Sequence, residues 1–117
     1  MFKLVFFVPP DHAEAVKEAV FQAGGGSYEK YDRCSWQSQG TGQFRPLSGS
    51  NPFIGRAGIG EAGQLERLEE FRVEILLPDH VALAAVEALL RAHPYEEPAY
   101  EVYRIFQHKD LSKEVMP

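Results

Sequence analysis

The chain has 117 residues, which fits one domain of ordinary size. It is 44% hydrophobic, so it can bury a core without disulfides or metal ions as staples. A formal net charge of −5 argues against a nucleic-acid-binding face, which needs a basic patch. The single cysteine, Cys34, excludes an intrachain disulfide.

The sequence has no segment suited to a membrane or to export. No apolar run approaches the ~20 residues that a bilayer-spanning helix needs. The opening stretch, Met1–Pro10, is too short for a secretory leader and is broken by prolines. We therefore expect a soluble, cytoplasmic protein with neither a membrane nor a nucleic acid as partner.

An internal repeat organises the chain. Residues 4–31 and 71–100 each run from an apolar strand through Pro-Asp-His into an Ala-rich helix, then to a turn and a Tyr-Glu strand start. Apolar residues at three- and four-residue spacing predict the two helices. Asp11 and Asp79 are predicted N-caps because a short carboxylate can accept free N–H groups of the first turn. Asp11 and Glu14 have the spacing of a capping box.

Two such halves predict an α+β domain with the ferredoxin-like β-α-β-β-α-β plan. The glycines at 24–26 end the first helix, and Pro94 ends the second. We expect one domain over residues 1–107, followed by a polar tail over 108–117. The predicted elements are a strand Phe2–Val8, a helix Asp11–Ala23, a strand from Tyr28 to about Gln39, a strand within Leu65–Leu77, a helix Asp79–Ala92 and a strand from about Ala99 to Phe106.

The segment from Gly40 to Gly63 holds seven of the ten glycines. So long a stretch without a clear pattern is usually functional or disordered, and Phe44, Leu47, Phe53 and Ile54 argue against disorder. We expect an extended central hairpin there. Its backbone N–H groups, with Arg45 and Arg56, can hold an anion. The plainer interpretation is that the glycines allow turns and bulges in a long twisted hairpin.

The corner "HPYEEPAY", residues 93–100, allows two interpretations. His93, Glu96 and Glu97 carry the imidazole and carboxylate groups that suit a divalent metal ion. Neighbouring strand residues face opposite sides, so such a site needs further ligands from another segment or chain. In the alternative, Pro94 and Pro98 make a rigid turn and His93 caps the helix C-terminus.

Cys34 is the remaining candidate for reactive chemistry. A catalytic thiolate needs a nearby cation or helix N-terminus, and the adjacent Arg33 should point the opposite way. Cys34 is therefore predicted to be a packed residue, with metal ligation alongside His93 as the alternative. No Ser-His-Asp or Cys-His-Asn signature occurs, so no catalytic residue is predicted.

Two stretches, "CSWQSQGTGQFRPLSGSNPFIG" and "HPYEEPAY", resemble the signature segments of a small domain inserted in bacterial Nif-three-like proteins. That domain is similar to PII signal proteins and CutA proteins. The resemblance covers roughly Met1 to Phe106 and implies a free-standing version of the domain. It implies trimers formed through sheet edges and small-ligand or metal-ion sites between subunits. The two-metal body of the Nif-three-like proteins is missing, so its metal chemistry does not carry over.

We therefore expect a non-catalytic, oligomeric, regulatory PII/CutA-like domain that binds a small ligand, a metal ion or a partner protein. The rival functions are a metal-dependent hydrolase related to the Nif-three-like family and a purely structural assembly module. The cofactor considered is a divalent metal ion. The predicted ligand-binding residues are Arg45, Asn51, Arg56 and Tyr95, and the predicted metal ligands are His93, Glu96, Glu97 and Cys34.

Overall fold

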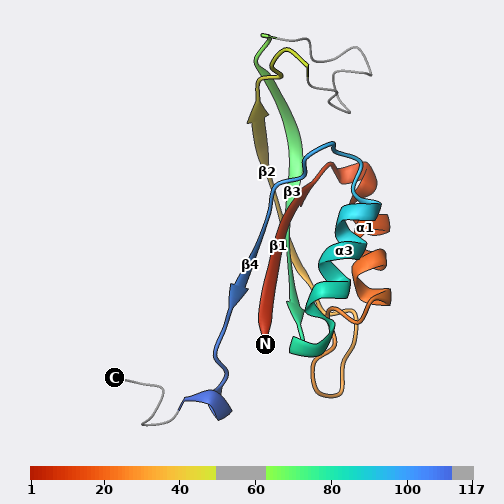
Figure 1. Cartoon of the computed structure of the whole chain (residues 1–117), viewed down its shortest axis with the longest axis vertical. Helices are drawn as coiled ribbons and strands as arrows, with labels where there is room; N and C mark the ends of the chain where they lie inside the picture. The colour runs from red at the N-terminus through yellow and green to blue at the C-terminus, as the bar shows by residue number, and fades with distance from the viewer. Residues whose placement is uncertain (50–62, 112–117) are drawn as a thin grey trace.

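Strand β1 (Phe2–Val8) lies near the centre of a four-stranded antiparallel sheet with the order β2-β3-β1-β4. The computed structural model describes residues 1–49 and 63–111. Both helices cover the same face of the sheet (Figure 1). The ferredoxin-like plan is therefore confirmed. After β1 the chain forms α1 (Pro10–Gln22), β2 (Trp36–Phe44), β3 (Glu66–Leu77), η1 (Asp79–Val81), α3 (Ala82–Ala92), β4 (Tyr100–Arg104) and η2 (His108–Asp110).

The core forms where the alternating side chains of the two central strands meet the helices. Leu4, Phe6 and Val8 of β1 are fully buried, because every second residue of a strand faces the same side. On β3 the buried residues are Val73, Ile75 and Leu77, and α1 and α3 add Val16, Val20, Ala85 and Leu89. The opposite face of the sheet carries charged side chains of the central strands, including Lys3, Arg72 and Glu74.

The hairpin of β2 and β3 extends beyond the rest of the sheet (Figure 1). Strand β1 pairs with β3 only from Phe71 to Leu77, whereas β2 pairs with β3 from Glu66 to Glu74. Residues 66–70 of β3 consequently have β2 as their sheet neighbour and no partner strand on the other side among the described residues. The predicted extended hairpin is confirmed, and residues 66–70 of β3 form a two-stranded ribbon with β2.

The predicted position of the second strand is wrong. Tyr28 and Tyr31 instead form an isolated bridge around a tight turn, in which Glu29 has a φ of 55°. Arg33, which also has a positive φ, donates to the Glu18 carboxylate at 3.1 and 2.6 Å and so holds this turn against α1. The strand starts only at Trp36 and continues past its predicted end near Gln39 through Gly40 and Gly42.

The predicted N-caps are also wrong. Pro9 occupies the cap of α1 and Pro10 the first helical position, where a missing N–H has no cost. Asp11 therefore lies inside the first turn and makes no capping hydrogen bond. Asp79 starts the 3-10 turn η1, and its carboxylate binds the amino group of Met1. The second predicted helix accordingly splits into η1 and α3.

Buried His93 fixes the C-terminal end of α3. Its side chain is 7% exposed, and its Nε2 lies 2.6 Å from the carbonyl oxygen of Phe7 at the end of β1. The backbone N–H of Tyr95 donates to Nδ1 at 3.1 Å. Because Nδ1 is an acceptor, Nε2 carries the ring proton and donates it to Phe7. His93 thus occupies the predicted C-cap position of α3, but as a buried neutral imidazole that joins α3 to β1 and not as a positive charge at the helix end.

Within the described part of the chain, no helix is both long enough and apolar enough to cross a bilayer.

Replacing Gly25 with alanine should lower the free energy of unfolding by roughly 1–3 kcal/mol. A Cβ at Gly25 would lie 2.8 Å from Val20 Cγ1 and 2.9 Å from Leu77 Cδ2, both in the core. Urea denaturation at one protein concentration measures the change. Gly40→Ala is the matched control, because a Cβ there meets no atom within 4 Å, and it should change stability by less than about 0.5 kcal/mol. Equal effects of the two substitutions would contradict this packing.

His93 should make folding stability depend on pH below neutrality. Burial lowers the pKa of His93 from its usual 6.5, so the unfolded chain takes up a proton more readily than the folded protein. The free energy of unfolding should therefore fall as the pH drops below about 6.5 and level off below the folded-state pKa. Urea denaturation between pH 7.5 and pH 5 should show a smaller slope for His93→Gln than for the wild type. His80→Gln, which changes an exposed histidine, should keep the wild-type slope. A wild-type slope in His93→Gln would contradict the assignment.

Candidate functional site

The helix-to-strand corner and the hairpin meet through Tyr95. Its hydroxyl group donates to Glu70 Oε2 at 2.8 Å. The centroids of the Tyr95 and His93 rings are 4.7 Å apart. Burial and the neighbouring Glu70 carboxylate raise the pKa of Tyr95, so the phenol keeps its proton and acts as the donor. His93, Tyr95 and Glu70 thereby connect the end of β1 to β3.

Gly42 allows the Glu70 side chain to take this position. A Cβ at Gly42 would overlap the Glu70 carboxylate, so only glycine leaves that surface of β2 free. Gly42 pairs with Leu68 and Gly40 with Glu70 across the ribbon. The two distinctive segments of the sequence, the glycine-rich stretch and the corner 93–100, are thus joined within one chain by Glu70.

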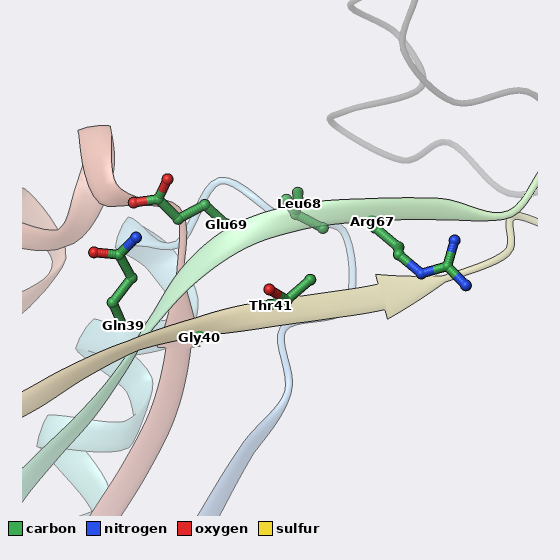
Figure 2. A pocket seen from close by; sticks show the side chains of 6 residues that line it. All are labelled: Gln39, Gly40, Thr41, Arg67, Leu68 and Glu69. Atoms are coloured by element: carbon green, nitrogen blue, oxygen red, sulfur yellow. The ribbon is translucent and has the colours of Figure 1, made fainter.

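An open depression of about 520 Å³ lies on the same ribbon. Figure 2 shows four polar side chains around it: Gln39 and Thr41 from β2, and Arg67 and Glu69 from β3. Alternation from buried Val73 places Glu69 and Arg67 on the helix-facing side of β3, and Thr41 is the direct cross-strand partner of Glu69. Gly40 and Leu68 complete the lining.

These four polar side chains are available to a ligand. All four are exposed, and none of them has a hydrogen bond or ion pair with any other side chain in the described part of the chain. Arg67 and Glu69 extend in opposite directions along the ribbon, with Thr41 between them (Figure 2). The depression therefore offers one positive charge, one negative charge, an amide and a hydroxyl.

The structure places the predicted ligand-binding residues in different surroundings. Arg45 is exposed and directly follows β2, whereas Tyr95 is half-buried at the corner. Asn51 and Arg56 lie outside the described residues. Neither Arg45 nor Tyr95 lines the depression, and none of the described residues that line it was predicted from the sequence.

The predicted metal ligands are not brought together within one chain. Both ring nitrogens of His93 already have hydrogen-bond partners in the backbone. The backbone N–H of Cys34 donates to Gly26, and that of Gly26 donates to Leu76, which pairs with Lys3 of β1. The His93 ring instead contacts Phe7, four residues or ~13 Å further along β1. The described ranges contain no group of three or more His, Cys, Asp and Glu side chains suited to one ion. Metal ligation by Cys34 alongside His93 therefore stays a prediction that needs residues of another copy.

Sequence reasoning missed Glu70, Arg67, Glu69, Gln39 and Thr41. The only available signal was the alternation of Gln39, Thr41 and Gln43 with glycines, which indicates a strand with one polar face. That signal was lost because the predicted strand ended at about Gln39, before Gly40 and Gly42. Which residues of β3 stand opposite depends on the strand register, which local sequence does not specify.

No family model matches the chain. Two bacterial relatives, both named GTP cyclohydrolase 1 type 2 homolog, are similar over most of it. The Halalkalibacterium halodurans protein is 43% identical over 103 residues, covering 88% of this chain and 26% of the relative. The Bacillus subtilis protein is 41% identical over 105 residues, covering 90% of this chain and 27% of the relative.

Solved structures agree with these sequence relatives. A Bacillus cereus protein related to NIF3 superposes with a TM-score of 0.74 at 40% identity, over 91% of this chain and 26% of that one. The PII-like protein CutA from Nostoc superposes with a TM-score of 0.64 at 14% identity, over 98% of this chain and 90% of that one. The chain thus spans about a quarter of its Nif-three-like relatives and nearly a whole CutA fold. It corresponds to one segment of these longer relatives, and its fold is that of CutA.

Proposed function

We propose that this domain is a homo-oligomeric, non-catalytic ligand-binding module whose cleft forms between copies beside the β2–β3 ribbon. The observation that carries the proposal is the protruding ribbon itself. A two-stranded ribbon alone is marginally stable in water, and residues 66–70 of β3 extend past the end of β1. Packing against a second copy would cover it.

The other edge of the sheet supports the same conclusion. All five residues of β4 are exposed, although Tyr100, Val102 and Tyr103 are large and partly apolar. Trp36, at the start of the opposite edge strand, is 58% exposed. Exposed strand edges with large side chains favour pairing with another chain. The likeness to CutA proteins favours a trimer among the possible assemblies.

The ligand-binding part of the proposal rests on the surroundings of the ribbon. The depression between Gln39 and Arg67 lies open within one chain, and a second copy would enclose it. Arg45 follows β2 directly and supplies a further cation for an anionic group. Tyr95 and Glu70 hold the ribbon against the corner, so a ligand bound there is coupled to both segments.

The rival functions have less support. A metal-dependent hydrolase needs an ion held beside a general base, and no suitable ligand group lies within the described residues. The relatives are named after GTP cyclohydrolase, but this chain matches only about a quarter of them. Metal binding by Glu96 and Glu97 together with residues of another copy stays a prediction. A purely structural module would not use the exposed polar set of the depression.

The protein should elute with a mass several times its 13.2 kDa, with three copies as the favoured number. Light scattering coupled to size exclusion measures this mass. Trp36→Ala should reduce the assembly to smaller species at micromolar concentration. A tryptophan that becomes buried between subunits can contribute about 2 kcal/mol to the free energy of association.

Leu83→Ala is the control for this measurement, because Leu83 is 73% exposed on α3, away from both strand edges. It should keep the wild-type mass. A wild-type mass of one chain at tens of micromolar would contradict the proposed function, as would equal behaviour of the two variants.

A further inference from the structure

We propose that the depression on the β2–β3 ribbon binds a short peptide with free termini, of two or three residues. The inference rests on the proposed function, since it names the ligand class of the same cleft. It depends on the order of the polar groups along the ribbon, which is Arg67, then Glu69 with Thr41, then Gln39.

The charge pattern selects a ligand with both signs. Arg67 would attract a carboxylate, and Glu69 would attract an ammonium group. A simple anion would be repelled by Glu69 and a simple cation by Arg67, so neither fits the pair. Because neither side chain has an internal ion pair, a zwitterion can bind without breaking one.

The spacing of the charges selects a peptide over a single amino acid. The Cα atoms of residues two apart on a strand are ~6.8 Å apart. Arg67 and Glu69 point away from each other (Figure 2), so their charged groups lie farther apart than that. An α-amino acid carries both charges on one carbon and cannot span that separation. An extended chain covers ~3.5 Å per residue, so the termini of a dipeptide lie ~7 Å apart.

The remaining groups match a peptide backbone. Thr41 lies directly across from Glu69, and Gln39 is the next residue on the same face of β2. A hydroxyl and a side-chain amide each donate and accept, as the N–H and C=O of a peptide bond require. Gly40, between them on β2, also lines the depression.

The test is a titration followed by two-dimensional 15N–1H NMR, with dialanine as the probe. Dialanine should produce saturable shifts at residues 39–41 and 67–69. Alanine and N-acetyl-dialanine amide should bind roughly fivefold more weakly or worse, because each lacks the spaced pair of charges. Arg67→Gln and Glu69→Gln should each weaken dialanine binding by roughly two- to fivefold. Arg91→Gln and Glu87→Gln on α3 remove matched exposed charges and should leave the affinity unchanged.

Absence of saturable shifts with dialanine would overturn this inference, and so would equal affinity for alanine or the blocked peptide. If dialanine fails in this way but the wild-type protein has the mass of an oligomer, the proposed function stands and only the ligand class is wrong. Dialanine binding at residues 39–41 and 67–69 in a protein of single-chain mass would support the peptide site and contradict the proposed assembly.

Discussion

The buried imidazole of His93 is the contact on which the arrangement of this domain depends. Strand β1 ends where α1 begins, and α3 must end at the same level for the chain to return along β4. His93 achieves this by donating from Nε2 to Phe7 and accepting at Nδ1 from Tyr95, so one side chain fixes three backbone segments. A buried polar group without such partners would cost several kcal/mol, which ties the corner to this one geometry.

The same corner explains how the hairpin is positioned. Once His93 fixes the backbone at Tyr95, the phenol reaches Glu70, and Glu70 lies over Gly42. The glycine-rich segment and the corner are therefore parts of one constellation, although about 50 residues separate them in the chain. These residues have a positioning role: the protonated phenol of Tyr95 and the carboxylate of Glu70 hold the ribbon on which the polar depression lies.

Much of the fold could be predicted because the two halves of the repeat show the same order of strand, helix and strand start. The alternation in β3 and the apolar run in β1 gave those strands to within a residue. The second strand was misplaced because Tyr28 and Glu29 match the repeat but enter a turn held by Arg33 and Glu18. The role of His93 could not be predicted, since a charged helix cap, a metal ligand and a buried link to β1 have the same local sequence. Long-range contacts such as Tyr95 to Glu70 need the register, which only the folded chain provides.

The most direct test of the His93 assignment is long-range 15N–1H NMR of its imidazole ring across a pH titration, with and without added Zn²⁺. The structure predicts an Nε2-protonated neutral ring at pH 7 that titrates below pH 6.5 and is unchanged by zinc. An Nδ1-protonated ring or a titration at or above pH 6.5 would contradict this account. A zinc-dependent shift of the ring nitrogens would also contradict it and would indicate that His93 binds metal.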